Sequence, residues 1–89
     1  MIFADELTVD PKLAKSYQKL LKAIAEEKIP LSWYLIARPG SNAFPYNIYP
    51  AYLLKEPYYR DLQETVVGVA SSKEEAMKLA GAMAVKDLS

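Results

Sequence analysis

The chain has 89 residues, of which 52% are hydrophobic, and its 11 basic residues balance its 11 acidic ones. This length predicts a single domain over residues 1–89, and the hydrophobic fraction is too high for a disordered chain. A net charge of zero lacks the surplus of Lys and Arg from which nucleic-acid-binding proteins gain most of their affinity. The absence of cysteine and histidine removes disulfides, the commonest metal ligands and the usual general base near neutral pH.

No apolar run approaches the ~20 residues that a membrane-spanning helix needs. The first residues, MIFADE, also lack the basic and apolar regions of a signal peptide. We therefore expect a cytoplasmic protein with no membrane segment, no metal and no cofactor.

The first nine residues, MIFADELTV, predict either a short edge strand or an arm that docks on another surface. Asp10 and Pro11 predict the start of a helix, since Asp is a favoured N-cap and Pro suits the first helical position. This helix should end before Pro30, because a proline disfavours helical geometry in the residue that precedes it. Its apolar face consists of Leu13, Tyr17, Leu20, Leu21 and Ile24.

The opposite face of this helix carries four lysines: Lys12, Lys15, Lys19 and Lys22. Such a stripe occurs on nucleic-acid and membrane surfaces, and it also occurs on any solvated helix face. We favour the solvated face, because Glu26 shares the stripe and Glu27 lies nearby. Nucleic-acid binding through the lysines is the alternative function.

Three segments in the middle of the chain predict strands or short helical turns. LSWYLIA at 31–37 predicts a strand by its aromatic and branched residues. Residues 43–49 predict a second strand, which Pro45 confines to a sheet edge or a late start. Residues 50–55 predict one or two helical turns closed by Pro57, with a continued strand as the alternative.

The segment ETVVGVA at 64–70 has the clearest strand pattern, and its valines indicate that both faces are covered. Gly68 within it indicates a bulge, a close approach of another backbone, or a small residue under a helix. The sequence does not distinguish these three readings.

Ser72 and Glu75 form a capping box, which predicts a helix from Lys73 to about Asp87. Close packing is a plausible reason for Gly81, because glycine costs about 1 kcal/mol relative to alanine inside a helix. The residues expected to be buried are Ala76, Leu79, Ala80, Met83 and Ala84. Together the elements predict an α+β fold with a two- or three-stranded sheet packed by an N-terminal and a C-terminal helix. The predicted order is α-β-(β or short α)-β-α.

Five residues of the last helix, Ser72, Lys73, Ala76, Ala80 and Ala84, match the pattern Ser-Lys-Lys-x-Ala-Lys-x-x-Ala-Ala-x-x-Ala-Leu. In this pattern and in element order the chain resembles double-stranded-RNA-binding domains, in which Lys73 would contact RNA. The second and third lysines of the pattern are replaced by Glu74 and Met77, and the histidine of that family's inter-strand loop is absent. We therefore expect the RNA affinity to be lost.

A second set of residues, Ile48 to Leu54, Pro57-Tyr58-Tyr59, Val66 to Ala70 and Glu74-Glu75-Ala76, resembles a pattern in small uncharacterised proteins of Firmicutes. The resemblance implies a bacterial cytoplasmic setting and a short helix at 50–55. It implies no activity and no site residues.

Catalytic residues are not indicated, because adjacent acidic residues on a helix point about 100° apart and do not converge on one site. The aromatic residues are the remaining candidates. We expect two or three of the five tyrosines between residues 46 and 59 to lie in the core, and the others to form a partner surface with Trp33. The candidates are Trp33, Tyr46, Tyr49, Tyr52, Tyr58 and Tyr59. The predicted function is a non-enzymatic interaction or accessory domain that binds another protein or a second copy of itself.

Overall fold

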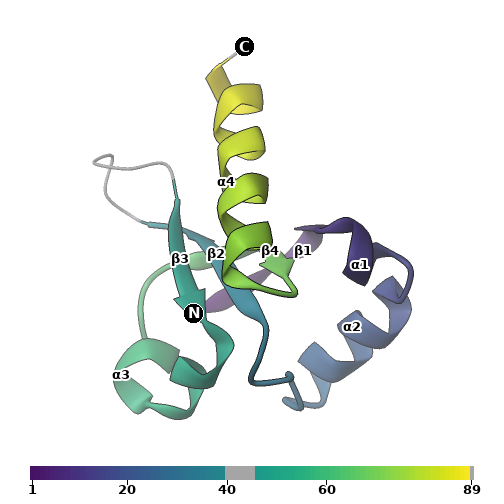
Figure 1. Ribbon diagram of the computed structural model, residues 1–89. Coiled ribbons are helices and arrows are strands. Elements are labelled where there is room, and N and C mark those ends of the chain that lie inside the picture. Colours follow the sequence, from purple (N-terminus) through teal and green to yellow (C-terminus); the bar gives the residue numbers. More distant parts are fainter. Residues whose placement is uncertain (40–45, 89) are drawn as a thin grey trace.

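A four-stranded mixed sheet with helices on both faces is seen in the computed structural model, which describes residues 1–39 and 46–88 (Figure 1). The strands are β1 (Ile2–Val9), β2 (Tyr34–Arg38), β3 (Asn47–Pro50) and β4 (Thr65–Ala70). The helices are α1 (Pro11–Ala14), α2 (Tyr17–Ala25), the 3-10 helix η1 (Ala51–Lys55), α3 (Pro57–Arg60) and α4 (Lys73–Leu88).

The strand order in the sheet is β1-β4-β2-β3. β4 runs parallel to β1 and antiparallel to β2, and β2 pairs antiparallel with β3. The prediction of a two- or three-stranded sheet in the order α-β-(β or short α)-β-α is therefore wrong. The predicted order left out the start of the chain, where Ile2–Val9 form an edge strand. Of the two alternatives for the first nine residues, the edge strand is therefore confirmed.

The pairing of β1 with β4 is interrupted. Phe3 pairs with Val66 and Thr8 pairs with Gly68, so residues 4–7 of β1 bulge away from the regular register. Leu7 fills the space inside the bulge as a buried side chain, and its N–H donates a hydrogen bond of 3.2 Å to the Tyr17 hydroxyl. An irregular edge of this kind also hinders pairing with the strand of another molecule.

The predicted first helix is broken into α1 and α2 at Ser16, whose backbone dihedrals are φ −121° and ψ 35°. Asp10 caps α1 as expected, because its Oδ1 accepts the Leu13 N–H at 2.9 Å. After the break, α2 lies across the sheet with Leu20 buried and Tyr17 next to the bulge of β1. Because of the break, α1 follows directly after β1 while α2 takes another direction and covers the sheet.

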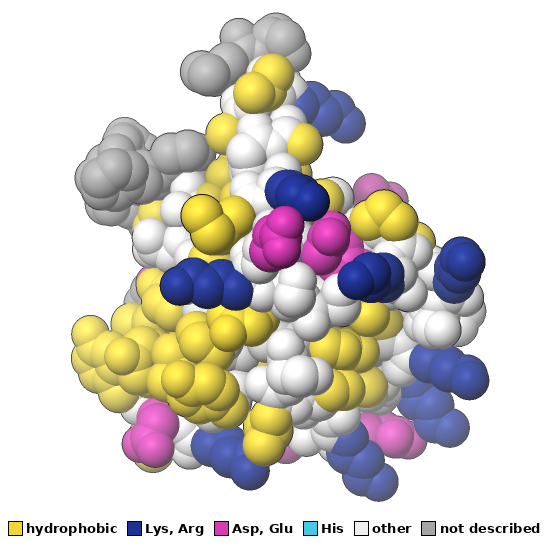
Figure 2. Space-filling model, in the orientation of Figure 1, with side chains coloured by type: hydrophobic (Ala, Val, Ile, Leu, Met, Phe, Trp, Pro, Cys, Tyr) yellow, Lys and Arg dark blue, Asp and Glu magenta, His cyan; other side chains and the backbone are white. Residues whose placement is uncertain are grey.

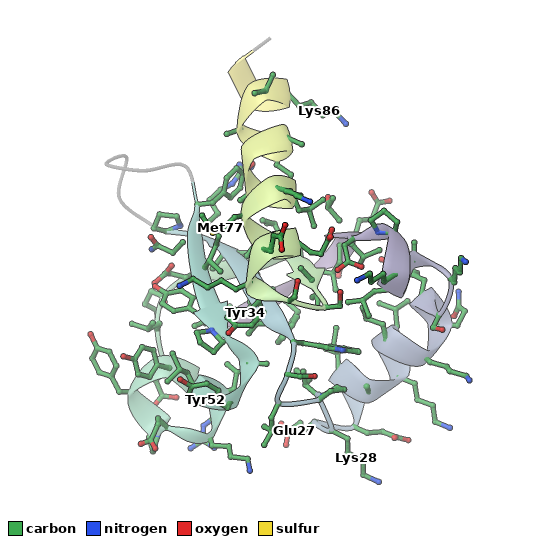
Figure 3. All side chains as sticks on the ribbon, in the orientation of Figure 1. Glu27, Lys28, Tyr34, Tyr52, Met77 and Lys86 are labelled. Atoms are coloured by element: carbon green, nitrogen blue, oxygen red, sulfur yellow. The ribbon has the colours of Figure 1, made fainter. Side chains whose placement is uncertain are left out.

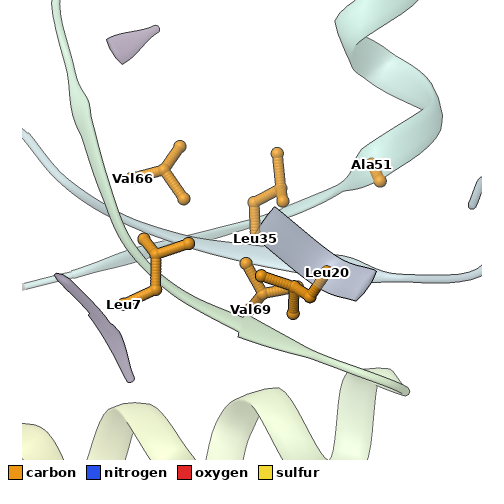
Figure 4. Packing of buried hydrophobic residues seen from close by; sticks show 6 residues of the cluster. All are labelled: Leu7, Leu20, Leu35, Ala51, Val66 and Val69. Atoms are coloured by element: carbon orange, nitrogen blue, oxygen red, sulfur yellow. The ribbon is translucent and has the colours of Figure 1, made fainter. Parts of the chain in front are cut away.

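The main core lies between the sheet and the helices α2 and η1 (Figure 4). Its buried residues are Leu7, Leu20, Leu35, Ala51, Val66 and Val69. Val66 and Val69 reach the same core because the register between β2 and β4 shifts between them, at Val67.

The other face of the sheet is covered by α4. Ala76 of α4 is fully buried against Ile36 and Ala70, while Leu79, Ala80 and Met83 are half-buried in the same cluster, as expected. Gly81 does not contribute to this packing. It is exposed, and a Cβ atom added to it meets no heavy atom within 4 Å, so close approach to the sheet is not the reason for this glycine.

Candidate functional site

The segment 51–60 forms two short helices that meet at a corner. Pro50 ends β3, and the N–H of Ala51 then donates a hydrogen bond of 2.8 Å to the Trp33 carbonyl, which ties η1 to the sheet. Glu56 closes η1 and precedes α3, whose first residue is Pro57. The prediction of helical turns in this region is confirmed, and the alternative of a continued strand at 50–55 is wrong. Two prolines and a buried Ala51 hold the corner in place.

Four tyrosines gather on this corner, and we call Tyr49, Tyr52, Tyr58 and Tyr59 the tyrosine surface. Tyr52 and Tyr58 are 52% and 71% exposed, whereas Tyr49 and Tyr59 are half-buried. Tyr59 contacts both Tyr58 and Tyr49 edge-on, with ring centroids 5.0 and 6.1 Å apart. Figure 2 shows a broad hydrophobic area over η1 and α3, and Figure 3 places Tyr52 within it.

The tyrosine surface is anchored by a polar network at its base. The Tyr49 hydroxyl donates to Glu64 Oε2 at 2.7 Å, and Asn47 Nδ2 donates to Glu64 Oε1 at 3.1 Å. Burial raises the pKa of Tyr49 to about 12, and the hydrogen bond to the Glu64 carboxylate and its negative charge add to this shift. The Glu64 carbonyl also accepts the Ile2 N–H at 3.0 Å, which links the network to β1. Glu64 could not be identified from the sequence, because its hydrogen-bond partners Asn47 and Tyr49 lie in another element.

The other two predicted aromatic candidates lie elsewhere. Trp33 is half-buried and packs against the main core. Tyr46 packs against the cluster beneath α4, where its hydroxyl accepts a hydrogen bond of 3.2 Å from Arg38 and its ring lies 5.6 Å from the Arg38 guanidinium. Of the five tyrosines between residues 46 and 59, three are half-buried and none is fully buried. We expected two or three of these tyrosines in the core, and the three half-buried ones, Tyr46, Tyr49 and Tyr59, lie at its margin.

The predicted lysines Lys12, Lys15, Lys19 and Lys22 are all exposed, and none is ion-paired with another described residue. Figure 2 shows Lys and Arg side chains along the side of the molecule that α1 and α2 form. The break at Ser16 divides the four between two helices, so they do not form one straight stripe. Lys73 lies at the start of α4, two residues after Ser71, which is hydrogen-bonded to Asp10 at the start of α1.

A buried carboxylate, Asp10, links two strand-to-helix junctions. Asp10 is 1% exposed, and its Oδ2 accepts the Ser71 N–H at 2.6 Å and the Ser71 hydroxyl at 2.7 Å. Burial raises the pKa of Asp10, but hydrogen bonds from Ser71, Leu13 and Lys12 outweigh it and leave the pKa below its usual value. The sequence predicted the helix cap but not the link to Ser71. Asp10 thus accepts hydrogen bonds from both junctions and stabilises the fold.

Two open cavities lie near the start of β1. One of about 470 Å³ is lined by Asp61 and Glu64 among others, and one of about 390 Å³ is lined mainly by apolar residues with Glu27, Lys55 and Arg60. Both oxygens of the Glu64 carboxylate already accept hydrogen bonds from Asn47 and Tyr49. Glu64 and Asp61 are therefore not arranged as a general acid and a general base facing one substrate.

The described residues contain no group of three or more acidic side chains placed to hold a metal ion. Within residues 1–39 and 46–88 no helix combines the length and apolar character that crossing a bilayer requires. The tyrosine surface thus remains the best-supported candidate site. No family model, curated protein or solved structure matches the chain, so both resemblances remain predictions.

Proposed function

We propose that the protein is a non-enzymatic interaction domain that binds a partner protein through the tyrosine surface. The observation that carries the proposal is that the side chains of Tyr52 and Tyr58 are 52% and 71% exposed. Both lie on the corner that the buried Ala51 attaches to the core. Tyrosine is enriched in protein interfaces because its ring buries a large area while its hydroxyl keeps a polar partner. A cytoplasmic setting, which suits a chain without cysteine, is part of the proposal.

The rigidity of the corner supports this function. Binding is stronger when the contacting side chains are already ordered, because less conformational entropy is lost. Tyr58 rests edge-on against Tyr59, Tyr59 rests against Tyr49, and Tyr49 is held by Glu64. The exposed Tyr58 ring therefore rests on a series of ordered contacts that ends at Glu64.

The test is affinity capture from cells with the wild type, a Tyr52→Ser/Tyr58→Ser double variant and a Leu31→Ser control. Leu31 is 49% exposed and lies outside the tyrosine surface, so the control removes a comparable apolar side chain. We expect a protein that is retained by the wild type and the control and lost with the double variant. The captured protein is then purified, and calorimetry with the same three chains should show binding weakened about tenfold or more only by the double variant. Equal capture by all three chains would contradict the proposal.

Nucleic-acid binding is the second candidate. The observation in its favour is the exposure of four lysines along residues 12–22, none of them ion-paired with a residue that the structure describes. The balanced net charge speaks against it. A titration with duplex RNA and duplex DNA at ~50 mM salt distinguishes the two candidates, since phosphate binding weakens steeply as the salt concentration rises. Binding that is lost in a Lys19→Gln/Lys22→Gln variant would support this candidate, and no binding at low salt would end it.

A further inference from the structure

The open cavity of about 390 Å³ lies where the main core reaches the surface. It is bounded by the start of β1, by the end of α2 with the segment that follows it, and by η1 with the end of α3. In Figure 1 the end of α2 and η1 both lie at the lower end of the molecule. Small-molecule sites in proteins usually have volumes of roughly 300–1,000 Å³, so the size of this cavity suits a small ligand.

The walls of the cavity are mostly apolar. All of the apolar wall residues except Leu31 belong to the main core or pack against it, and Leu31 is 49% exposed. A ligand with an apolar body that entered the cavity would therefore extend the main core and remove apolar surface from water. The apolar wall residues include Phe3, Ile24, Ile29, Leu31, Ala51 and Leu54.

The charged groups of the cavity are unevenly distributed. Lys55 and Arg60 both come from the corner formed by η1 and α3, whereas Glu27 comes from the segment after α2. All three side chains are exposed, and none is ion-paired with another residue that the structure describes. The Met1 amino group donates a hydrogen bond to the Arg60 carbonyl, which holds the end of α3 beside β1. The side chains of the cavity thus carry one positive charge in excess, and both positive charges lie on one wall.

We infer that this cavity binds a small amphipathic monocarboxylate, which has an apolar body that ends in one carboxylate group. Lys55 and Arg60 attract the carboxylate, and the apolar walls cover the body. A single negative charge matches the excess of one positive charge, whereas a phosphate monoester carries nearly two. Glu27, on a different wall, repels a second carboxylate and so disfavours dicarboxylates. The inference does not depend on the tyrosine surface or on the proposed function.

A titration with octanoate, followed by nitrogen–proton NMR of the backbone amides, tests the inference. We expect saturable shifts at Ile24, Ile29 and Leu31, with a Kd of about 1 mM or lower for a ligand of this size. Hexanoate should bind about tenfold more weakly, because it buries two fewer methylene groups. Octylammonium has the same chain with the opposite charge, and it should bind about fivefold or more weakly than octanoate.

Charge variants test which residues bind the carboxylate. At low salt Lys55→Gln/Arg60→Gln should weaken octanoate binding about fivefold, since each exposed ion pair contributes modestly. Lys12→Gln/Lys15→Gln removes the same charge at exposed positions outside the cavity and should bind as the wild type does. Glu27→Gln should bind octanoate about twofold more tightly. The replaced side chains are all exposed, so the fold should be retained, and the dispersion of the same spectra checks this.

Three results would overturn the inference. The first is the lack of saturable shifts at the cavity residues with millimolar octanoate. The second is equal binding of octanoate and either hexanoate or octylammonium, which would show that the apolar walls or the positive charges do not select the ligand. The third is wild-type affinity in Lys55→Gln/Arg60→Gln. We expect Tyr52→Ser/Tyr58→Ser to bind octanoate as the wild type does, so failure of this inference leaves the proposed function standing.

Discussion

The Tyr49 hydroxyl donates a hydrogen bond of 2.7 Å to Glu64 Oε2 and so joins β3 to the segment that precedes β4. The same carboxylate accepts from Asn47 at 3.1 Å, so both of its oxygens are occupied. Tyr49 in turn supports Tyr59 edge-on. The Glu64 carboxylate thus holds Tyr49, which supports the exposed Tyr58 through Tyr59.

Replacement of Glu64 by Gln should lower the pKa of Tyr49 from its value of about 12, because the negative charge that opposes ionisation is removed. In the unfolded wild type Tyr49 ionises near pH 10, whereas in the folded protein it stays protonated up to a pH of about 12. The free energy of unfolding therefore falls as the pH rises from about 10 to about 12. An ultraviolet titration of tyrosinate, with Tyr49→Phe to assign the step, measures the shift. Glu56→Gln removes an exposed carboxylate from the same corner and should leave the step in place. An unchanged step in Glu64→Gln would show that the charge does not control Tyr49.

Asp10→Ala should lower the free energy of unfolding by about 3 kcal/mol, since it removes a helix cap and leaves the Ser71 donors without their acceptor. The pKa of Asp10 is lower in the folded state than its ordinary value of 3.8. The contribution of Asp10 to the free energy of unfolding is therefore complete above pH 3.8, and it is lost as the pH falls through the pKa of the folded state. Urea unfolding between neutral and acid pH measures both effects. Asp5→Asn, at an exposed position of β1, should change stability by less than about 0.5 kcal/mol. An Asp10→Asn variant with wild-type stability and acid sensitivity would contradict this role.

Glu27→Gly should raise the free energy of unfolding by about 1 kcal/mol. Glu27 has a φ of 57° and ends α2, where its N–H donates to Ile24 and the Lys28 N–H donates to Ala23. Glycine occupies this left-handed position without the steric cost that a side chain adds. Glu26→Gly is the control, because the φ of Glu26 is −89° and glycine gains nothing there. Thermal unfolding should rank Glu27→Gly above the wild type and Glu26→Gly below it, and the reverse order would refute the argument.

Gly68→Ala should destabilise the fold by about 1–3 kcal/mol. An added Cβ would lie 3.0 Å from the Thr8 carbonyl oxygen and 3.2 Å from Ile36 Cδ1, so β1 would have to move away from β4. Of the three readings that the sequence left open, close approach of a backbone is the one seen here, beside the register shift at Val67. Gly81→Ala is the matched control and should stabilise by about 1 kcal/mol. Equal effects of the two substitutions on chemical denaturation would refute this distinction.

The elements with local signals were predictable from the sequence. The capping box at Ser72 marks the start of α4, and the Ser72 hydroxyl accepts the Glu75 N–H at 3.2 Å as that motif requires. The sequence left β1 open between an edge strand and a docking arm, because its bulge removes the alternation of polarity and its partner β4 is distant in the chain. The hydrogen bonds from Ser71 to Asp10 could not be predicted either, because the two residues lie far apart in the sequence.

The tyrosine surface was predictable only in part. The cluster of aromatic residues is visible in the sequence, but which rings are exposed depends on how η1 and α3 turn at Glu56. Tyr58 and Tyr59 are neighbours in the chain, yet one is 71% exposed and the other is packed against Tyr49. Trp33 and Tyr46 were assigned to the surface by residue type alone, and tertiary packing placed them against the core on opposite faces of the sheet.

Photocross-linking in cells shows whether the tyrosine surface contacts a partner protein. A photoreactive benzoylphenylalanine is placed at position 58 in one chain, at position 52 in a second and at position 31 in a control chain. We expect one cross-linked partner protein that is common to positions 58 and 52 and is missing at position 31. Cross-linking that is absent at positions 58 and 52, or equal at all three, would contradict the assignment of the tyrosine surface as the binding site.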